Sequence, residues 1–198
     1  MEVSDYNSAQ TVAEWLKRGE VCIVPSDTVY VLVCAISQRK AIEKMAQLKG
    51  VRLDNARFSI VCADLSNLAQ YSKPIPTPYY RALKKHTPGV FTFILEANNA
   101  VPKLFVSRRT AIGLRVPESQ FLRDLAAACG EPLVVSSLHS KANPDEFPLT
   151  AHEAEDEWGN DVYQVVDGGK LSGELSTVVD LTHSTPIIVR QGGGDWNP

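Results

Sequence analysis

The sequence predicts a single α/β domain in which helices pack against a twisted, mixed β-sheet. Apolar runs rich in β-branched residues alternate with amphipathic segments through the first two-thirds of the chain. The closing third is rich in strands, which favours a mixed sheet over a purely parallel one. With 198 residues, 44% of them hydrophobic, the chain can build one substantial core. No repeat or linker divides it, so we expect one domain over residues 1–198.

The expected helices have apolar positions three and four residues apart. In the first, Val12, Trp15 and Leu16 lie on one face and Gly19 ends the turn. The second begins at Ser37, whose hydroxyl would cap it. We expect helices at residues 8–19, 37–49, from 64 or 66 to 71, after the proline-rich turn 73–78 up to residue 86, at 119–129 and at 151–158.

The expected strands are short apolar runs bounded by turn residues. They lie at residues 21–24, 58–62, 90–96, 110–117, 132–137, 162–166, 177–181 and 187–190. The run 29–35 is apolar throughout, and its pattern fits a helix or a strand. Residues 51–57, 97–109 and 138–150 read as loops, and Gly192–Gly194 as a flexible tail rather than a phosphate cradle.

Composition and charge exclude several classes of protein. The formal net charge of −3 argues against a wholly basic protein that coats nucleic acid, although a local basic patch stays open. The four cysteines are scattered without metal-ligand spacing, which predicts buried free thiols in a reducing compartment. Neither a secretory leader pattern nor an apolar stretch of membrane-spanning length is seen. We therefore expect a soluble cytoplasmic protein with no membrane partner.

Several common catalytic motifs are absent from the sequence. There is no G-x-x-x-x-G-K-[ST] loop, no G-x-G-x-x-G, no G-x-S-x-G and no HExxH. The four histidines are isolated, and we expect each at the surface. No metal site and no tightly bound cofactor is predicted from the residues.

Polar side chains follow or begin several of the expected strands. They are Ser26, Asp27, Thr28, Arg115, Ser136, Ser137, Ser176, Thr177 and Arg190. If these strand ends meet, they would line a cleft with hydroxyls and two arginines, with Lys49, Arg52 and Arg57 at its rim. Guanidinium groups bind carboxylate or phosphate in two-point geometry, so the cleft would suit anionic ligands. Blander alternatives remain: a turn or helix cap at 26–28, structural ion pairs for the arginines, and solvated surface charges at 51–57.

Five ordered motifs resemble those of the YrdC/YciO family, which includes the threonylcarbamoyl-adenylate synthases that act in tRNA modification. Residues 25–30, Pro-Ser-Asp-Thr-Val-Tyr, resemble the family's P-T-D-T-V-Y, and residues 87–89 its P-G turn. Residues 112–117 resemble its A-x-R-V-P strand, 176–181 its S-T-V-V-D, and 189–192 its closing R-x-G. The resemblance spans nearly the whole chain and implies a YrdC/RibB-like fold with a concave basic cavity.

The resemblance also implies a reaction. A carbamate made from threonine and bicarbonate would attack the ATP α-phosphate and release pyrophosphate, with Mg²⁺ on the phosphates; ATP would be a substrate. By motif match, Lys49 and Arg52 would be catalytic, with Lys49 on ATP and Arg52 on phosphate. Thr28, Arg115 and Ser176 would bind threonine, and Asn55, Ser137 and Arg190 would bind the nucleotide.

Three positions depart from the synthase pattern, and some segments are more similar to the YciO branch. Val31, Val51 and His139 stand where a glycine, an arginine and an asparagine are usual, while residues 58–71, 87–95 and 136–138 look like YciO. The alternative is a module that binds nucleotide, tRNA or double-stranded RNA and does little or no chemistry. Its basic patch would use Lys49, Arg52, Arg57, Lys84, Lys85, Lys103, Arg108 and Arg109.

Overall fold

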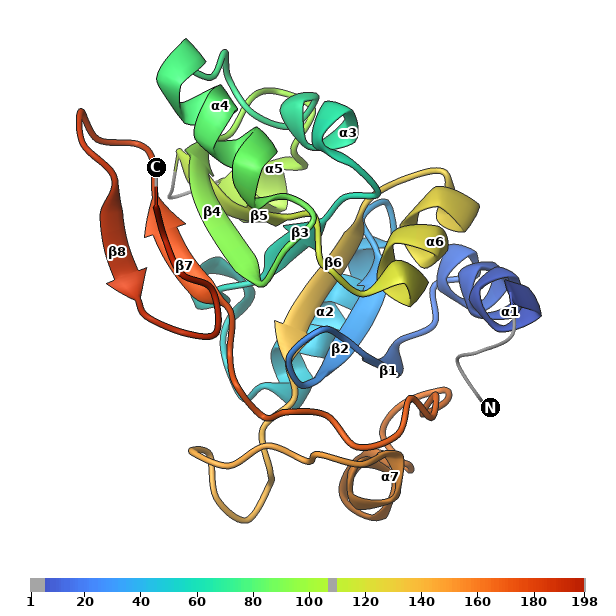
Figure 1. Ribbon diagram of the computed structural model, residues 1–198. Coiled ribbons are helices and arrows are strands. Elements are labelled where there is room, and N and C mark those ends of the chain that lie inside the picture. The colour runs from blue at the N-terminus through green and yellow to red at the C-terminus, as the bar shows by residue number, and fades with distance from the viewer. Residues whose placement is uncertain (1–5, 107–109, 198) are drawn as a thin grey trace.

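The structure, a computed structural model, describes residues 6–106 and 110–197. Eight strands form one mixed sheet in the order β1-β2-β6-β3-β5-β4-β7-β8 (Figure 1). They are β1 Cys22–Pro25, β2 Tyr30–Ala35, β3 Ser59–Val61, β4 Phe91–Glu96, β5 Ala111–Arg115, β6 Leu133–Ser137, β7 Thr177–Asp180 and β8 Ile187–Arg190. The β3–β5 and β4–β7 pairs are parallel and the other neighbours antiparallel. The predicted mixed α/β sheet is confirmed.

The helices cover both faces of this sheet. They are α1 Tyr6–Lys17, α2 Arg39–Leu48, α3 Leu65–Ala69, α4 Thr77–His86, α5 Lys103–Val106, α6 Gln120–Cys129 and α7 Ala151–Trp158, with a 3-10 turn η1 at Leu53–Asn55. The ends of α6 and α7 follow from capping residues. The Ser119 hydroxyl accepts from the Leu122 amide, and Thr150 with Glu153 forms a capping box.

Strand β2 explains why the run 29–35 is apolar throughout. Val31, Val33 and Ala35 pack with α1 and α6, which lie side by side in Figure 1. Leu32 and Cys34 point to the opposite face, into the core formed with α2, α3 and α4. Because successive side chains alternate between faces, a strand covered on both sides loses the polar alternation that would reveal it.

Three sequence-based expectations about local structure are wrong. Ser37 does not cap α2, since its hydroxyl donates to Glu131 Oε1 at 2.8 Å and the cap residue is Gln38. Residues 162–166 are no strand; they form one isolated bridge, between Val165 and Ile23, along the edge of β1. The segment 97–109 contains the short helix α5, and its residues 107–109 lie outside the described ranges.

The glycine segment at 192–194 is packed against the sheet rather than free. The Gly192 and Gly194 amides both donate to Thr177 Oγ1, at 2.9 and 3.1 Å. A Cβ on Gly194 would lie 2.6 Å from the Phe91 ring, so only glycine fits there. Further on, Trp196 packs against Phe91. The predicted flexible tail is therefore wrong.

The four cysteines are buried and free, as predicted. Two histidines predicted at the surface are half-buried instead, namely His86 and His139, whose rings contact Phe91 and Phe147. None of the helices in the described ranges has the length and apolar character needed to cross a membrane.

Candidate functional site

A cavity of about 760 Å³ lies over the sheet. Its floor comes from neighbouring strands in register, with Ser59 of β3 opposite both Val135 of β6 and Gly113 of β5. Next to these, Ile94 of β4 pairs with Gly113. The lining residues are Val31, Ala56, Arg57, Phe58, Ser59, Thr92, Ile94, Phe105, Thr110, Ala111, Ile112, Gly113, Arg115, Val135, Ser137, Ser176, Val178, Val189 and Arg190.

The position of the cavity follows from how the helices are distributed. The strand residues that pack with α1 and α6 come from β1, β2, β3 and β6. The half of this face formed by β5, β4, β7 and β8 is therefore left without cover from α1 or α6. The sequence predicted a crevice beyond the strand ends. The structure places the hollow across the face of the sheet, with several strand ends contributing to it.

Arg115 is the most deeply buried cation of the cavity, with 5% of the residue exposed. Its Nη2 donates to Asp27 Oδ1 at 2.7 Å, and its Nε donates to the Phe91 carbonyl at 3.2 Å. Two interpretations of this arginine were open, a structural ion pair and a ligand-binding role. Both fit the structure, because Arg115 pairs with the Asp27 carboxylate and also lines the cavity.

Arg190 approaches the same end of the cavity from β8. Its Nη2 lies 2.8 Å from the Ser176 carbonyl and 3.1 Å from the Ser176 hydroxyl, which in turn bonds Thr92 Oγ1 at 2.9 Å. Burial, and then the positive charge of Arg115, lower the pKa of Arg190. Two guanidinium groups near enough to repel each other form an electrostatic site that an anion would stabilise.

Lys49 reaches the cavity wall through Ser137. Its Nζ donates to the Ser137 carbonyl at 2.9 Å, and Ser137 lines the cavity. Burial lowers the pKa of Lys49 to about 8. Burial, and then the charge of Lys49, also lower the pKa of His139. The Lys49 ammonium is therefore near His139, one of the three residues that depart from the synthase pattern.

Thr28 is held in the turn between β1 and β2 and does not line the cavity. Only 2% of it is exposed, and its hydroxyl pairs with Ser26 Oγ at 2.9 Å. Ser26 Oγ also accepts from the Thr28 and Val29 amides. Ser26 therefore stabilises the turn, as one of the two interpretations of residues 26–28 predicted. Next to it, Asp27 connects this turn to Arg115.

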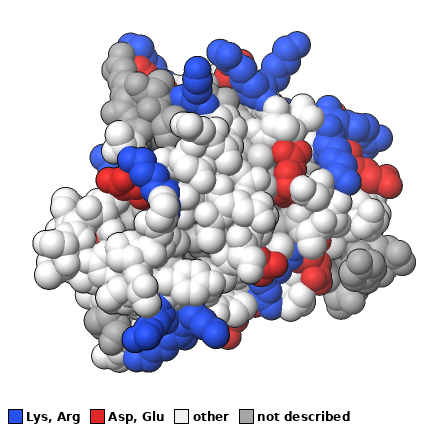
Figure 2. Space-filling model, turned by 90° about the horizontal axis from the view of Figure 1, so that it is seen from above, with Lys and Arg blue, Asp and Glu red and all other residues white. Residues whose placement is uncertain are grey.

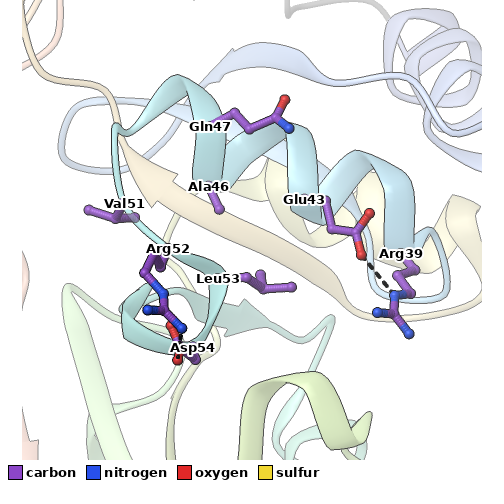
Figure 3. A pocket seen from close by; sticks show the side chains of 8 residues that line it. All are labelled: Arg39, Glu43, Ala46, Gln47, Val51, Arg52, Leu53 and Asp54. Atoms are coloured by element: carbon purple, nitrogen blue, oxygen red, sulfur yellow. Dashed lines mark hydrogen bonds and ion pairs between the residues drawn. The ribbon is translucent and has the colours of Figure 1, made fainter.

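Arg52 lies in a second, separate pocket of about 570 Å³ beside α2 (Figure 3). Its guanidinium pairs with Asp54 at 3.2 Å and is 78% exposed. Asn55, in η1, is exposed and absent from the wall of the large cavity, although the next residues, Ala56 and Arg57, line it. The structure therefore separates Arg52 from Lys49, the two residues that the resemblance assigned to catalysis.

The structure brings together four of the predicted site residues, Arg115, Ser137, Ser176 and Arg190, on one cavity. Sequence reasoning gave no binding role to Thr92, Gly113 or the apolar walls formed by residues such as Phe105. The alternation of Thr92 with Ile94, and of Ala111 with Gly113 and Arg115, was the available signal for a shared face. In the described ranges, no three His, Cys, Asp or Glu side chains could hold a metal ion.

The basic positions expected to form one patch are distributed over several elements. Arg57 lines the large cavity, Lys84 and Lys85 lie in the last turn of α4, and Lys103 begins α5. Arg108 and Arg109 lie outside the described residues. Figure 2 shows the face seen from above, with Lys and Arg in separate groups around a largely uncharged centre.

The fold is thus a mixed α/β sheet with a cavity on one face, and two arginines, Arg115 and Arg190, line that cavity. The chain belongs to the family that groups the Sua5, YciO and YrdC proteins, whose model, described as "Telomere recombination", matches residues 14–192. An uncharacterized protein of Haemophilus influenzae is 36% identical over 93% of this chain and 89% of its own length. YciO of Escherichia coli is 35% identical with the same coverage. Its crystal structure superimposes with a TM-score of 0.88, covering 96% of this chain and 92% of that one.

The threonylcarbamoyl-AMP synthases are more distant relatives. That of Pyrococcus abyssi is 26% identical over 94% of this chain, which spans 57% of the synthase. The structure of P. abyssi Sua5 complexed with L-threonine has a TM-score of 0.87 at 25% identity, covering 96% of this chain and 55% of that one. The resemblance to the YciO branch is confirmed.

Proposed function

We propose that the sheet-face cavity binds L-threonine and ATP, and that the chain joins them with bicarbonate into threonylcarbamoyl-AMP. The observation that carries this proposal is the convergence of Arg115 and Arg190 at one end of the cavity. A volume of about 760 Å³ lies within the range of small-molecule sites. The relative that was solved with L-threonine supports the choice of amino acid.

The residues divide between the two ends of the cavity. Arg115, Arg190 and Ser176 hold the threonine carboxylate, because guanidinium and hydroxyl groups donate to carboxylate oxygens. This assignment moves Arg190 from the nucleotide, where the resemblance placed it, to threonine, because it bonds Ser176. Lys49 and Arg57 face the phosphates. Ser137 lines the cavity wall next to Lys49, whose ammonium donates to its carbonyl. Asn55 stays a proposed nucleotide contact at the rim. Arg52 would first have to leave Asp54, so we give it no phosphate contact in this geometry.

The proposed reaction needs little covalent chemistry from the protein. Threonine and bicarbonate condense to the carbamate with loss of water. A carbamate oxygen then attacks the α-phosphorus of ATP, and pyrophosphate leaves. Mg²⁺ would enter as part of the ATP complex. The protein contributes positioning and preorganised positive charge, which lower the barrier without a covalent intermediate.

The test is an assay with ATP, L-threonine, bicarbonate and Mg²⁺ that measures both pyrophosphate and the adenylate product. We expect pyrophosphate release that requires threonine and falls at least about tenfold in Arg190→Met, which removes a charged hydrogen-bond donor. Arg39→Met is the matched control, because Arg39 is 74% exposed on α2 and pairs with Glu43. A wild-type protein without threonine-dependent turnover would contradict the synthase proposal.

A second function, RNA binding, is favoured by the distribution of charge. Residues 65–117 contain eight Lys or Arg and one Asp or Glu, a net charge of +7, whereas residues 137–185 contain two and ten, a net charge of −8. The helices α4 and α7 from these two segments lie at opposite ends of the molecule in Figure 1. Exposed cations of α4, such as Arg81 and Lys84, would bind a polyanion through its phosphates.

This second function is tested by fluorescence anisotropy with a short double-stranded RNA at low and moderate salt. Replacing two exposed cations of α4, in Arg81→Glu/Lys84→Glu, should weaken binding and flatten its salt dependence. Lys170→Glu, an exposed change in the acidic segment, should leave binding unchanged. Equal effects of the two sets of substitutions would contradict a role for α4.

A further inference from the structure

We propose that Asp27 is a positioning residue that makes the arginine end of the cavity selective for an anionic group with a single negative charge, such as a carboxylate. The proposal deepens the proposed function and rests on it, since it concerns the end of the cavity assigned to the threonine carboxylate. It predicts that a monocarboxylate is accepted and that a dianion such as sulfate is disfavoured.

Both oxygens of the Asp27 carboxylate are already bonded within the protein. Oδ1 accepts from Arg115 Nη2 at 2.7 Å, and Oδ2 accepts from the Glu118 amide at 2.9 Å. The side chain is 5% exposed, so it offers no free edge to a ligand. Asp27 therefore acts on the ligand through Arg115 rather than by contact.

These bonds fix which edge of the Arg115 guanidinium is available. The Nε group donates to the Phe91 carbonyl and Nη2 donates to Asp27. Among the described residues, Nη1 has no hydrogen-bond partner, and Arg115 lines the cavity. Because Asp27 and Phe91 hold two of the three nitrogens, the third is left to face a ligand in a single orientation.

Asp27 also sets the charge at this end of the cavity. Arg115 and Arg190 are close enough for the charge of one to lower the pKa of the other. Asp27 cancels one of the two positive charges, which leaves a net charge of +1. A single carboxylate would then complete a neutral site, whereas a dianion would leave one negative charge without compensation beside the buried Arg115–Asp27 pair.

The experiment measures the binding of two probes, L-threonine and inorganic sulfate, by isothermal titration calorimetry. In Asp27→Asn we expect the threonine affinity to fall at least about tenfold, as loss of a charge-assisted contact would cause. The affinity for sulfate should rise severalfold, because the site gains a net positive charge. Asp156→Asn removes the same charge from a side chain 65% exposed on α7 and should change neither affinity.

Asp27→Glu tests orientation separately and serves if Asp27→Asn does not fold. It keeps the charge and moves the carboxylate, so threonine binding should weaken without any gain in sulfate binding. The inference about Asp27 would be overturned if folded Asp27→Asn kept the wild-type ratio of threonine to sulfate affinity, or if Asp27→Glu kept the wild-type threonine affinity. Either result would leave the proposed function standing. A wild-type protein that binds no threonine would overturn the proposed function together with it.

Discussion

At the scale of single residues, Lys49 has the clearest electrostatic signature of the site. It follows the last turn of α2, with Nζ 2.9 Å from the Ser137 carbonyl. Burial lowers its pKa from 10.5 to about 8. A lysine of this kind can lose its proton near physiological pH, and an anion bound beside it would raise the pKa again.

The first prediction concerns the pH dependence of stability. Between pH about 8 and 10.5 the unfolded chain keeps a proton on Lys49 that the folded chain has lost. The Lys49 contribution to the free energy of unfolding therefore rises with pH across that window. In Lys49→Met this rise should be absent, so the stability of the variant minus that of wild type should decrease between pH 7 and pH 9.5, and this difference is the margin to be measured.

Urea unfolding of both proteins at the two pH values measures that margin. The buried thiols act in the opposite direction, because burial raises the pKa of Cys22, Cys62 and Cys129 to about 12 and stability then falls as the pH rises above the ordinary thiol pKa. Both proteins share this effect, so it cancels when they are compared. A margin that stays the same at both pH values would show that the Lys49 pKa is not lowered.

The second prediction separates binding from folding at the two arginines. Arg115→Ala is a poor test, because it leaves Asp27 as an unpaired buried charge, which typically costs about 3–5 kcal/mol. Arg190 is an exposed residue of β8, bonded only to Ser176 among the described residues. Arg190→Met should weaken L-threonine binding by about 1.5–3 kcal/mol and change stability by less than about 1 kcal/mol. Calorimetry and urea unfolding give the two values, and a large loss of stability with unchanged affinity would contradict the assignment.

At the scale of elements, the segment after α7 is bonded to β1 by backbone groups and to β2 by one tyrosine hydroxyl. Tyr30 of β2 donates to the Gly169 carbonyl at 2.8 Å and accepts from the Gly168 amide at 3.0 Å. The same segment reaches Thr28, whose carbonyl accepts from the Gly173 amide at 3.3 Å. A chain without regular structure is thereby held over the turn that presents Asp27.

The third prediction is that Tyr30→Phe lowers the free energy of unfolding by about 1–3 kcal/mol, because it leaves two backbone groups without a partner. Hydrogen exchange at the Gly168 amide should become faster. Tyr163→Phe, at a tyrosine that is 47% exposed, should stay within about 0.5 kcal/mol of wild type. Equal stability of all three proteins would mean that the Tyr30 hydroxyl does not fasten this segment.

The fourth prediction concerns the close approach of the glycine segment to Ser176. A Cβ on Gly192 would lie 2.1 Å from the Leu175 carbonyl oxygen and 2.7 Å from the Ser176 carbonyl carbon. Gly192→Ala should therefore cost about 1–3 kcal/mol of stability and weaken threonine binding by displacing Ser176. Gly193→Ala meets only the flexible Glu174 side chain, at 3.2 Å, and should cost less when both are measured by thermal unfolding. A larger loss in Gly193→Ala would contradict this.

The elements that sequence reasoning predicted well carry their own local signals. Helix α6 has Ser119 at its start and Gly130, with φ +72°, at its end. The run 162–166 has the composition of a strand, yet it forms only one bridge, to Ile23 along the edge of β1. Composition does not reveal such a position, since the local residues are the same in a ladder strand and in an edge segment.

At the scale of the whole molecule, the motifs identified the strands of the site but not which parts of them face the cavity. Arg115, Ser137, Ser176 and Arg190 were predicted to meet, and they do. The motif match placed Arg52 with Lys49 in the site. The turn η1 instead directs Arg52 toward Asp54, into another pocket. Side-chain direction in a short turn depends on tertiary packing, which spacing along the chain does not encode.

The apolar lining of the cavity could not be recognised from the sequence either, because it too depends on tertiary structure. Val178 and Ile94 look like core residues in the sequence, yet they line the hollow and are only partly buried, because the helix layer on this face ends before β5. Their exposure is a property of the sheet order β6-β3-β5-β4-β7, which joins segments far apart in the chain. A single sequence gives no signal for that order.

The most direct test of the account is a crystal structure of the protein with L-threonine and a non-hydrolysable ATP analogue. We predict the threonine carboxylate within hydrogen-bond distance of Arg115 and Arg190, beside Ser176, with the phosphates toward Lys49 and Arg57. Threonine bound elsewhere, for example in the pocket beside α2, with the arginine end empty, would contradict the central claim that two arginines on one face of the sheet form the anion site.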